Sequence, residues 1–289
     1  MLIYPFTPRT FELPDGSIIS YLDEGSGPVI VMLHGNPTWS FYYRNLISLL
    51  RDEYRLIVPD HIGCGLSSKP QNYPYHLKNH IDNLEILLSY LELKEHTLVF
   101  HDWGGAIGMG YAVRYPERIQ ALVVFNTAAF PAPDMPLRLR ICRLPFLGSL
   151  IVRGLNGFAR AAPYMAVTKK MDTEIVREYL KPYDSWENRI AILRFVQDIP
   201  MHENHPSWQT LLEIEAGLPL FKDRPMLIAW GGKDFCFNDW FYKEWRRRFP
   251  KSESHYFPEA GHYILEDAFD KLGPVVRDFL ERSISAFNK

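Results

Sequence analysis

The stretch TLVFHDWGGAIGMGYAVRYP, residues 97–116, decides the fold of this chain. An apolar run typical of a strand ends at Asp102, and a helical pattern then opens with Gly104 and Gly105. Small residues at this point permit a sharp strand–turn–helix, the nucleophile elbow, which carries a reactive side chain at its apex. Asp102 occupies that apex, although Phe100 stands where the elbow pattern has a small residue. The alternative interpretation is an aspartate that only caps the helix.

Working outward, further apolar runs predict strands that alternate with helices. Besides 97–102, the expected strands are residues 17–23, 29–34, 55–60, 119–126, 225–232 and 253–260. Several of these runs are nearly continuous, which is typical of parallel strands covered on both faces. Apolar residues at helical spacing predict a helix over 80–93 and another that begins at Pro274. This alternation predicts an α/β fold with a doubly wound, mainly parallel sheet.

The alternation is interrupted between about residues 127 and 215. The Pro-rich segment FPAPDMP (130–136) opens this stretch, and helical patterns without a convincing strand follow it. We therefore expect a core domain made of residues 1–128 and 216–289, with an inserted helical cap domain at 129–215. Such a cap would lie over the carboxyl edge of the sheet, where open α/β sheets bind their ligands.

Composition excludes several classes of protein and partner. With 32 basic and 34 acidic residues in 289, the formal net charge is −2, so we expect neither nucleic acid nor an anionic membrane as a partner. The three cysteines are widely spaced, which argues against a disulfide framework and a zinc ribbon. No signal-peptide pattern and no apolar run of about 18 residues is present. We expect a soluble, cytoplasmic protein without a membrane span.

No P-loop, EF-hand loop or GxGxxG motif occurs in the chain, so we expect neither a metal nor any other cofactor.

Two other strand ends carry groups suited to catalysis. WGGKD (230–234) presents Asp234, and PEAGHYILED (258–267) presents His262. A lone Asp or His is structural by default. Together with Asp102, however, they stand at the ends of the expected strands in the order nucleophile, acid, histidine, which is the order of a hydrolase triad. We therefore predict that Asp102, Asp234 and His262 are catalytic.

Six motifs together carry a family resemblance. They are HGNPTWS (34–40), PDHIGCGLSSKP (59–70), HDWGGAIG (101–108), YDSWENRIAILRFVQDIP (183–200), WGGKD (230–234) and GHYILED (261–267). The chain resembles the haloalkane dehalogenase family of α/β-hydrolases over nearly its whole length. It is most similar to the third subgroup, which also includes the β-lactone decarboxylases of bacterial olefin biosynthesis.

The resemblance implies haloalkane dehalogenation as the first hypothesis for function. Asp102 would attack carbon and form an ester, and His262, oriented by Asp234, would activate water to cleave it. Backbone N–H groups of Asn36 and Trp103 would stabilise the oxyanion. By analogy with the family, the amide of Asn36 and the indole of Trp103 would bind the departing halide.

Three alternative functions stay open. The nearest is decarboxylation of a β-lactone, a cis-3-alkyl-4-alkyloxetan-2-one, to an alkene, which also begins with attack by Asp102. An epoxide hydrolase would need an acid in the cap, for which Tyr164, Tyr179 and Tyr183 are candidates. Asn36 favours halide over epoxide, because related epoxide hydrolases usually carry an aromatic residue there. A ligand-binding protein on a retired hydrolase scaffold is the non-enzymatic alternative.

Partners and cap contacts follow from these hypotheses. The expected partners are a small apolar substrate, either a haloalkane or a β-lactone, and a halide ion. The aromatic-rich string DFCFNDWFYKEW (234–245) is compatible with a homo-oligomer and equally with core packing. In the cap, Trp186 and Trp208 are expected either to line the pocket or to anchor the core.

Overall fold

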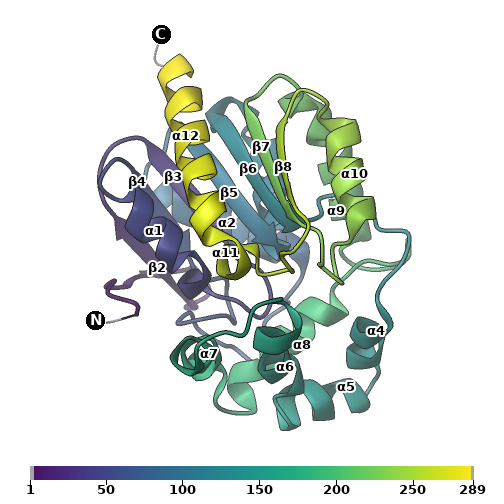
Figure 1. Ribbon diagram of the computed structural model, residues 1–289. Coiled ribbons are helices and arrows are strands. Elements are labelled where there is room, and N and C mark those ends of the chain that lie inside the picture. The colour runs from purple at the N-terminus through teal and green to yellow at the C-terminus, as the bar shows by residue number, and fades with distance from the viewer. Residues whose placement is uncertain (1–2, 288–289) are drawn as a thin grey trace.

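A single eight-stranded sheet forms the centre of the computed structural model, which describes residues 3–287. The strand order is β1-β2-β4-β3-β5-β6-β7-β8 (Figure 1). The strands are β1 Arg9–Glu12, β2 Ile18–Glu24, β3 Val29–Leu33, β4 Arg55–Pro59, β5 His96–Asp102, β6 Ile119–Thr127, β7 Met226–Gly231 and β8 Glu253–Phe257. All pairings from β4 through β8 are parallel. The predicted mainly parallel α/β sheet is therefore confirmed.

The first two strands differ from the expectation. β2, predicted as one more strand of the alternating set, runs antiparallel to both of its neighbours. It pairs with β1 through a tight turn in which the N–H of Leu13 donates to the carbonyl oxygen of Ser17. β1 was not predicted, because it is only four residues long and mostly exposed, so it carries no apolar run.

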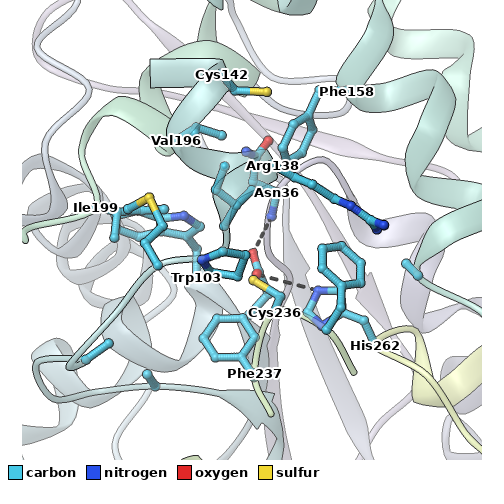
Figure 2. A pocket seen from close by; sticks show the side chains of 18 of the residues that line it. Asn36, Trp103, Arg138, Cys142, Phe158, Val196, Ile199, Cys236, Phe237 and His262 are labelled. Carbon is cyan, nitrogen blue, oxygen red and sulfur yellow. Dashed lines mark hydrogen bonds and ion pairs between the residues drawn. The ribbon is translucent and has the colours of Figure 1, made fainter. Parts of the chain in front are cut away.

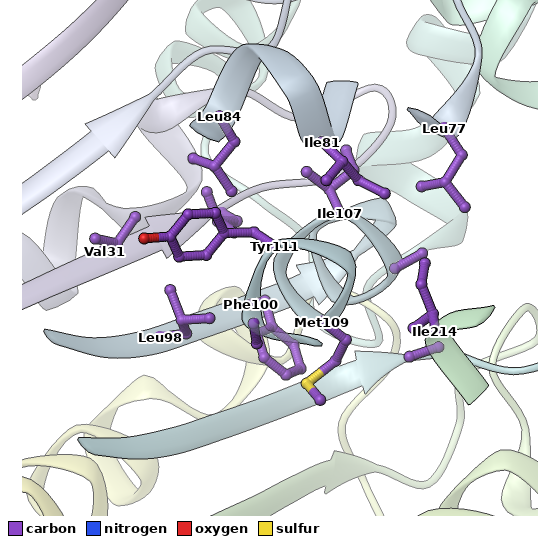
Figure 3. Packing of buried hydrophobic residues seen from close by; sticks show 14 of the residues in the cluster. Val31, Leu77, Ile81, Leu84, Leu98, Phe100, Ile107, Met109, Tyr111 and Ile214 are labelled. Atoms are coloured by element: carbon purple, nitrogen blue, oxygen red, sulfur yellow. The ribbon is translucent and has the colours of Figure 1, made fainter. Parts of the chain in front are cut away.

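Helices cover both faces of the sheet. The core helices are α1 Arg44–Leu50, α2 Leu77–Tyr90, α3 Trp103–Arg114, α9 Trp208–Gly217, α10 Asp239–Arg248, α11 Ile264–Asp267 and α12 Phe269–Phe287, with the short 3-10 helices η1 Ser40–Tyr43, η2 Pro116–Arg118 and η6 Leu218–Phe221. α1 and α12 lie on one face, and α2 lies behind the sheet (Figure 1). Successive side chains of a strand point to opposite faces, so Leu98 and Phe100 pack with α2 and α3, and Val99 packs with α1 and α12. Figure 3 shows the first of these two cores.

The last helix begins earlier than predicted. The sequence pattern places its start at Pro274, whereas α12 begins at Phe269 and contains Pro274. The reason is that the N–H groups of Lys271 and Leu272 already bond to the carbonyl oxygen of Ala268, which closes the first turn before the proline. The aromatic string 234–245 packs inward in part, since Phe241 and Trp245 of α10 are buried in the core.

The cap lies between β6 and α9, and its described residues form helices and connecting loops without a strand. It contains α4 Leu137–Arg143, α5 Leu147–Ser149, the π-helix η3 Leu150–Gly154, α6 Gly157–Met165, α7 Thr173–Leu180, η4 Lys181–Tyr183, η5 Glu187–Arg189 and α8 Ile190–Gln197. A small apolar core of its own, including Leu139, Val152 and Ile192, holds these helices together. The predicted boundary between residues 215 and 216 falls inside α9, which packs against α3. No described helix is long and apolar enough to cross a bilayer.

Candidate active site

The turn between β5 and α3 has the geometry that the sequence predicted for an elbow. Asp102 has φ 53° and ψ −126°, a conformation that costs energy for a residue with a side chain. The close approach of α3 to the sheet requires glycine, because a Cβ on Gly104 would collide with the carbonyl oxygen of Leu33. The Asp102 side chain makes no capping hydrogen bond to α3. A role as a helix cap therefore does not explain the residue.

The Asp102 carboxylate is instead held from the neighbouring strand end. After β3, the backbone N–H of Asn36 donates to Oδ1 of Asp102 at 2.7 Å. A Cβ on Gly35 would collide with the Asp102 side chain, so only glycine leaves room for the carboxylate there. The turn after β3 thus orients the carboxylate and leaves Oδ2 for other contacts.

His262 connects Asp102 to Asp234. Its Nδ1 lies 2.7 Å from Oδ2 of Asp234, and its Nε2 lies 3.5 Å from Oδ2 of Asp102. All three side chains are buried. The structure therefore brings together the three residues that the sequence analysis selected from the ends of β5, β7 and β8.

Asp234 is anchored by a group that the sequence analysis did not select. Its Oδ1 accepts hydrogen bonds from the backbone N–H groups of Cys236 at 2.6 Å and Phe237 at 3.0 Å. Its Oδ2 accepts from Nδ2 of Asn126, at the end of β6, at 3.0 Å. Asn126 is itself fixed to Gly231, donating to its carbonyl oxygen at 3.0 Å and accepting from its N–H at 2.8 Å. The sequence signal that could have identified Asn126 is that it is a polar residue at the end of the apolar run 119–126.

The charges of these groups depend on one another. Burial lowers the pKa of His262, but the carboxylates of Asp234 and Asp102 outweigh it and raise that pKa to about 10. Burial raises the pKa of Asp102, but His262 and the N–H of Asn36 hold it below its ordinary value. Burial, with a smaller effect of His262, lowers the pKa of the neighbouring His101 to about 3. At neutral pH the site therefore holds a protonated His262 beside the ionised carboxylate of Asp102.

A cavity of about 510 Å³ opens above Asp102, between the sheet edge and the cap (Figure 2). This volume is typical of small-molecule sites, which span about 300–1,000 Å³. Asn36, Asp102, Trp103 and His262 provide polar groups on the core side. The cap side is mainly apolar and includes Met135, Leu139, Cys142, Phe158, Ala162, Met165, Val196 and Ile199. The site can therefore hold an apolar molecule against a carboxylate.

The two residues expected to bind a halide line this cavity. Nδ2 of Asn36, however, donates to the carbonyl oxygen of Ile192 in α8 at 3.1 Å. One of its two amide N–H groups is therefore engaged by the cap. Its Oδ1 is buried and has no hydrogen-bond partner among the described residues. Trp103 packs against Phe195 of the same helix, with ring centroids 5.1 Å apart.

The aromatic candidates of the cap lie elsewhere. Tyr179 donates to Glu266, and Tyr183 donates to the carbonyl oxygen of Thr38 at 3.3 Å. Tyr164 is 66% exposed. None of these three lines the cavity, and neither does Trp186 or Trp208, so no cap tyrosine in the described structure is placed to protonate an epoxide oxygen. In the described part of the chain, no group of three or more His, Cys, Asp and Glu side chains is arranged to hold a metal ion.

Comparison with known proteins shows relatives over nearly the whole chain. Residues 28–269 match the α/β hydrolase fold family. The chain is 50% identical to a cis-3-alkyl-4-alkyloxetan-2-one decarboxylase of Shewanella oneidensis, covering 96% of this chain and 89% of that protein. A protein of the same name from Xanthomonas campestris is 44% identical, covering 97% of this chain and 98% of that one. Haloalkane dehalogenase 2 of Mycobacterium tuberculosis is 32% identical, covering 95% of each.

Solved structures agree with these relatives. A putative ancestral haloalkane dehalogenase superposes with a TM-score of 0.87 at 26% identity, covering 96% of this chain and 99% of that one. The haloalkane dehalogenase DatA of Agrobacterium tumefaciens gives a TM-score of 0.85 at 27% identity, covering 96% and 97%. The chain therefore belongs to the α/β-hydrolase fold family, in the haloalkane dehalogenase branch that also contains the β-lactone decarboxylases.

Proposed function

We propose that this protein is a β-lactone decarboxylase, which converts a cis-3-alkyl-4-alkyloxetan-2-one into an alkene and carbon dioxide. The observation that carries the proposal is the 50% and 44% identity to two proteins of that name, against 32% to a dehalogenase. This ranks the decarboxylase above the dehalogenase that was the first hypothesis from the sequence.

Asp102 begins the proposed reaction as a nucleophile. Its ionised carboxylate attacks C4 of the lactone, the alkyl-bearing ring carbon that is bonded to the ring oxygen. The carbon–oxygen bond of the ring breaks with inversion, and its electron pair stays on the released carboxylate. That carboxylate then leaves as carbon dioxide, and the electrons of the broken carbon–carbon bond form the alkene and expel Asp102. Anti elimination after inversion gives a cis alkene from a cis lactone, and the sequence consumes neither water nor a proton.

The charge distribution of the site supports this sequence of steps. Asp102 is ionised because His262 and the N–H of Asn36 lower its pKa. The His262 imidazolium, with its Nε2 3.5 Å from Oδ2 of Asp102, lies close to where the ring opens and stabilises the carboxylate charge by electrostatics. Asp234 orients the imidazole through the hydrogen bond to Nδ1. His262 carries a proton before the reaction begins, because the two carboxylates raise its pKa, and none of the proposed steps requires it to give that proton up.

Dehalogenation is the second candidate, because it uses the same three residues. It requires that His262 accept a proton from water once Asp102 is esterified. The ester carries no charge, so one of the two carboxylates that raise the pKa of His262 is then absent. The apolar cap side of the cavity suits two alkyl chains as well as one haloalkane.

Product analysis tests the proposal. The enzyme is incubated with a cis-3,4-dialkyl β-lactone and, separately at equal enzyme concentration, with a 1-bromoalkane. We expect cis alkene and carbon dioxide from the lactone, and loss of this activity in Asp102→Ala. Asp239→Ala is the matched control, because Asp239 is an exposed carboxylate at the start of α10. Absence of alkene overturns the proposal, and bromide release in its place assigns dehalogenation.

Isotopic labelling separates the two chemistries at Asp102 itself. In water enriched in oxygen-18, hydrolysis of an aspartyl ester at its carbonyl carbon leaves label on the carboxylate, whereas decarboxylation leaves none. After many turnovers with the lactone, mass spectrometry of the peptide that contains Asp102 is expected to show no added label. Label acquired during lactone turnover would contradict the proposed steps.

A further inference from the structure

Charge is distributed unevenly within the cap, because residues 129–215 carry 11 basic and 10 acidic residues but most of the basic ones are concentrated near its start. Residues 135–171 carry seven of the 32 basic residues and none of the 34 acidic ones, so this segment has a formal charge of +7 and the remainder −9. The net charge of −2 conceals this separation. A single-sign region of this kind attracts surfaces of opposite charge.

The same segment exposes an unusual amount of apolar surface. Nine of the sixteen exposed large hydrophobic side chains in the described structure lie between residues 137 and 165, and they are Leu137, Ile141, Leu144, Phe146, Leu147, Leu150, Leu155, Tyr164 and Met165. Scattered exposed apolar residues are normal, but a concentration of them marks an interaction surface. We call these nine side chains the cap patch.

The cap patch is built from neighbouring elements. α4 packs on α5, and η3 contacts both α5 and α6. In Figure 1 these helices lie at the end of the molecule opposite the C-terminus. Leu137, Ile141 and Leu144 follow the i, i+4, i+7 spacing of one helical face. Leu139 and Cys142, between them in sequence, are buried and line the cavity, so α4 is apolar on two sides.

Phe146 is the most exposed member of the cap patch. Its side chain is 91% exposed, and its φ of 60° lies in the left-handed region that favours glycine. A bulky residue in that region is strained, and strain of this kind is concentrated at functional sites. In water this residue therefore combines backbone strain with an unburied aromatic ring, and contact with an apolar phase would bury the ring.

Most of the seven basic residues around the cap patch form no ion pair with an acidic side chain. In the described structure Arg140 alone among them does so, with Asp134. Arg153 stacks on Trp186 at 4.4 Å and donates to neutral oxygens. Arg160 is exposed. The segment therefore combines apolar side chains with excess positive charge.

We propose that the cap patch docks on an anionic lipid surface. Exposed leucine and aromatic side chains would enter the boundary between headgroups and acyl chains, and the surrounding arginines and lysines would contact the lipid phosphates. This is peripheral attachment, compatible with the absence of a spanning helix among residues 3–287.

The cap patch and one wall of the cavity belong to the same helices. If the proposed function holds, a long-chain lactone passes between bilayer and cavity through this face; the docking itself does not depend on that function.

Charge also argues against a second copy of this chain as the occupant. A two-fold dimer places the same patch against itself, so each seven-residue basic set would face another. Like charges brought together in an apolar contact are repulsive. An anionic bilayer presents the opposite charge and an apolar interior together.

Vesicle co-sedimentation tests the proposal with the full chain. Vesicles of phosphatidylglycerol and phosphatidylethanolamine are compared with vesicles of phosphatidylcholine, at low salt and at about 1 M salt, where the Debye length falls to about 3 Å. We expect binding to the anionic vesicles that weakens at high salt. Two double variants, Phe146→Ser with Leu150→Ser and Arg160→Glu with Lys170→Glu, are each expected to weaken it about tenfold or more.

A matched control lies outside the cap segment. Leu220 is 56% exposed and Lys222 is exposed, so Leu220→Ser with Lys222→Glu removes the same kinds of group elsewhere on the surface. This control is expected to bind vesicles as the wild type does. An equal loss in the control, or equal binding to phosphatidylcholine, overturns the proposal. Absence of vesicle binding also overturns the proposal. If, in addition, the cap-patch variants change the molecular mass measured by light scattering, the patch is assigned to a contact between protein molecules.

The outcome is separable from the proposed function. Vesicle binding is measured without turnover, and alkene formation from a short-chain, water-soluble lactone is measured without lipid. Alkene formation without vesicle binding overturns the docking alone, and vesicle binding without alkene formation overturns the decarboxylase alone.

Discussion

Replacing Asn126 with alanine tests how the acid of the site is held. Asn126 is fully buried at the end of β6 and makes three hydrogen bonds, one with Asp234 and two with Gly231. Asn126→Ala removes all three and leaves the N–H of Gly231 without its side-chain acceptor. A net hydrogen bond contributes about 1 kcal/mol and one to a charged group about 2 kcal/mol, so the free energy of unfolding is expected to fall by about 3–4 kcal/mol.

The expected change in Tm follows from the size of the chain. For 289 residues the entropy of unfolding is about 0.6 kcal/mol per kelvin, so Tm is expected to fall by about 5–7 °C. Differential scanning calorimetry measures this directly. Gln120→Ala is the matched control on the same strand, because the Gln120 amide makes one bond, at 3.1 Å, to the exposed Glu95. That control is expected to lose less than about 1 kcal/mol.

Asn126→Ala is expected to lower kcat only moderately, although it lowers the free energy of unfolding substantially. Oδ1 of Asp234 keeps the N–H donors of Cys236 and Phe237, and Oδ2 keeps its hydrogen bond with His262, so the carboxylate stays in place and loses only the Asn126 donor. We expect about a tenfold loss in kcat with little change in KM, because the positioning of His262 is affected and the cavity is not. Unchanged Tm and unchanged kcat in Asn126→Ala would refute this account of the site.

Two further predictions concern charge and packing. Raising the pH from about 6.5 to about 10 is expected to lower the free energy of unfolding, because the folded-state pKa of His262 lies above its ordinary value and its stabilising proton is lost over that window. In Asp102→Asn one of the two carboxylate charges is gone, so NMR titration should find a lower pKa for His262; an unchanged value would contradict the coupling. Gly104→Ala is expected to destabilise strongly because its Cβ meets the backbone oxygen of Leu33, whereas Gly273→Ala in α12 meets flexible side chains at 3.1 Å or more and gains helix propensity. Denaturant midpoints for the two variants check this, and equal destabilisation would count against the steric argument.

The sequence by itself determined the architecture and selected the three central residues of the candidate site. Continuous apolar runs that alternate with helical patterns are typical of parallel strands covered by helices on both faces, and small residues after Asp102 permit the elbow. Both signals are local, so they can be identified without the structure. Because carboxyl ends of parallel strands meet at one edge, Asp102, Asp234 and His262 were expected together there, and the structure places them within hydrogen-bonding or ion-pair distance.

Tertiary structure alone decided which groups support that site and which face of the cap is left uncovered. Asn126 is a strand-end polar residue until β6 and β7 pair and bring its amide to Asp234, 108 residues away in the chain. Tyr179 and Tyr183 are cap tyrosines whose hydroxyl groups are used by Glu266 and Thr38, contacts that no sequence spacing indicates. Helical apolar spacing in α4 likewise predicts a buried face, but this helix buries one apolar face against the cavity and leaves another exposed. The physical reason is common to all three: a side chain's partner is set by which elements pack against it, and that depends on residues far away in sequence.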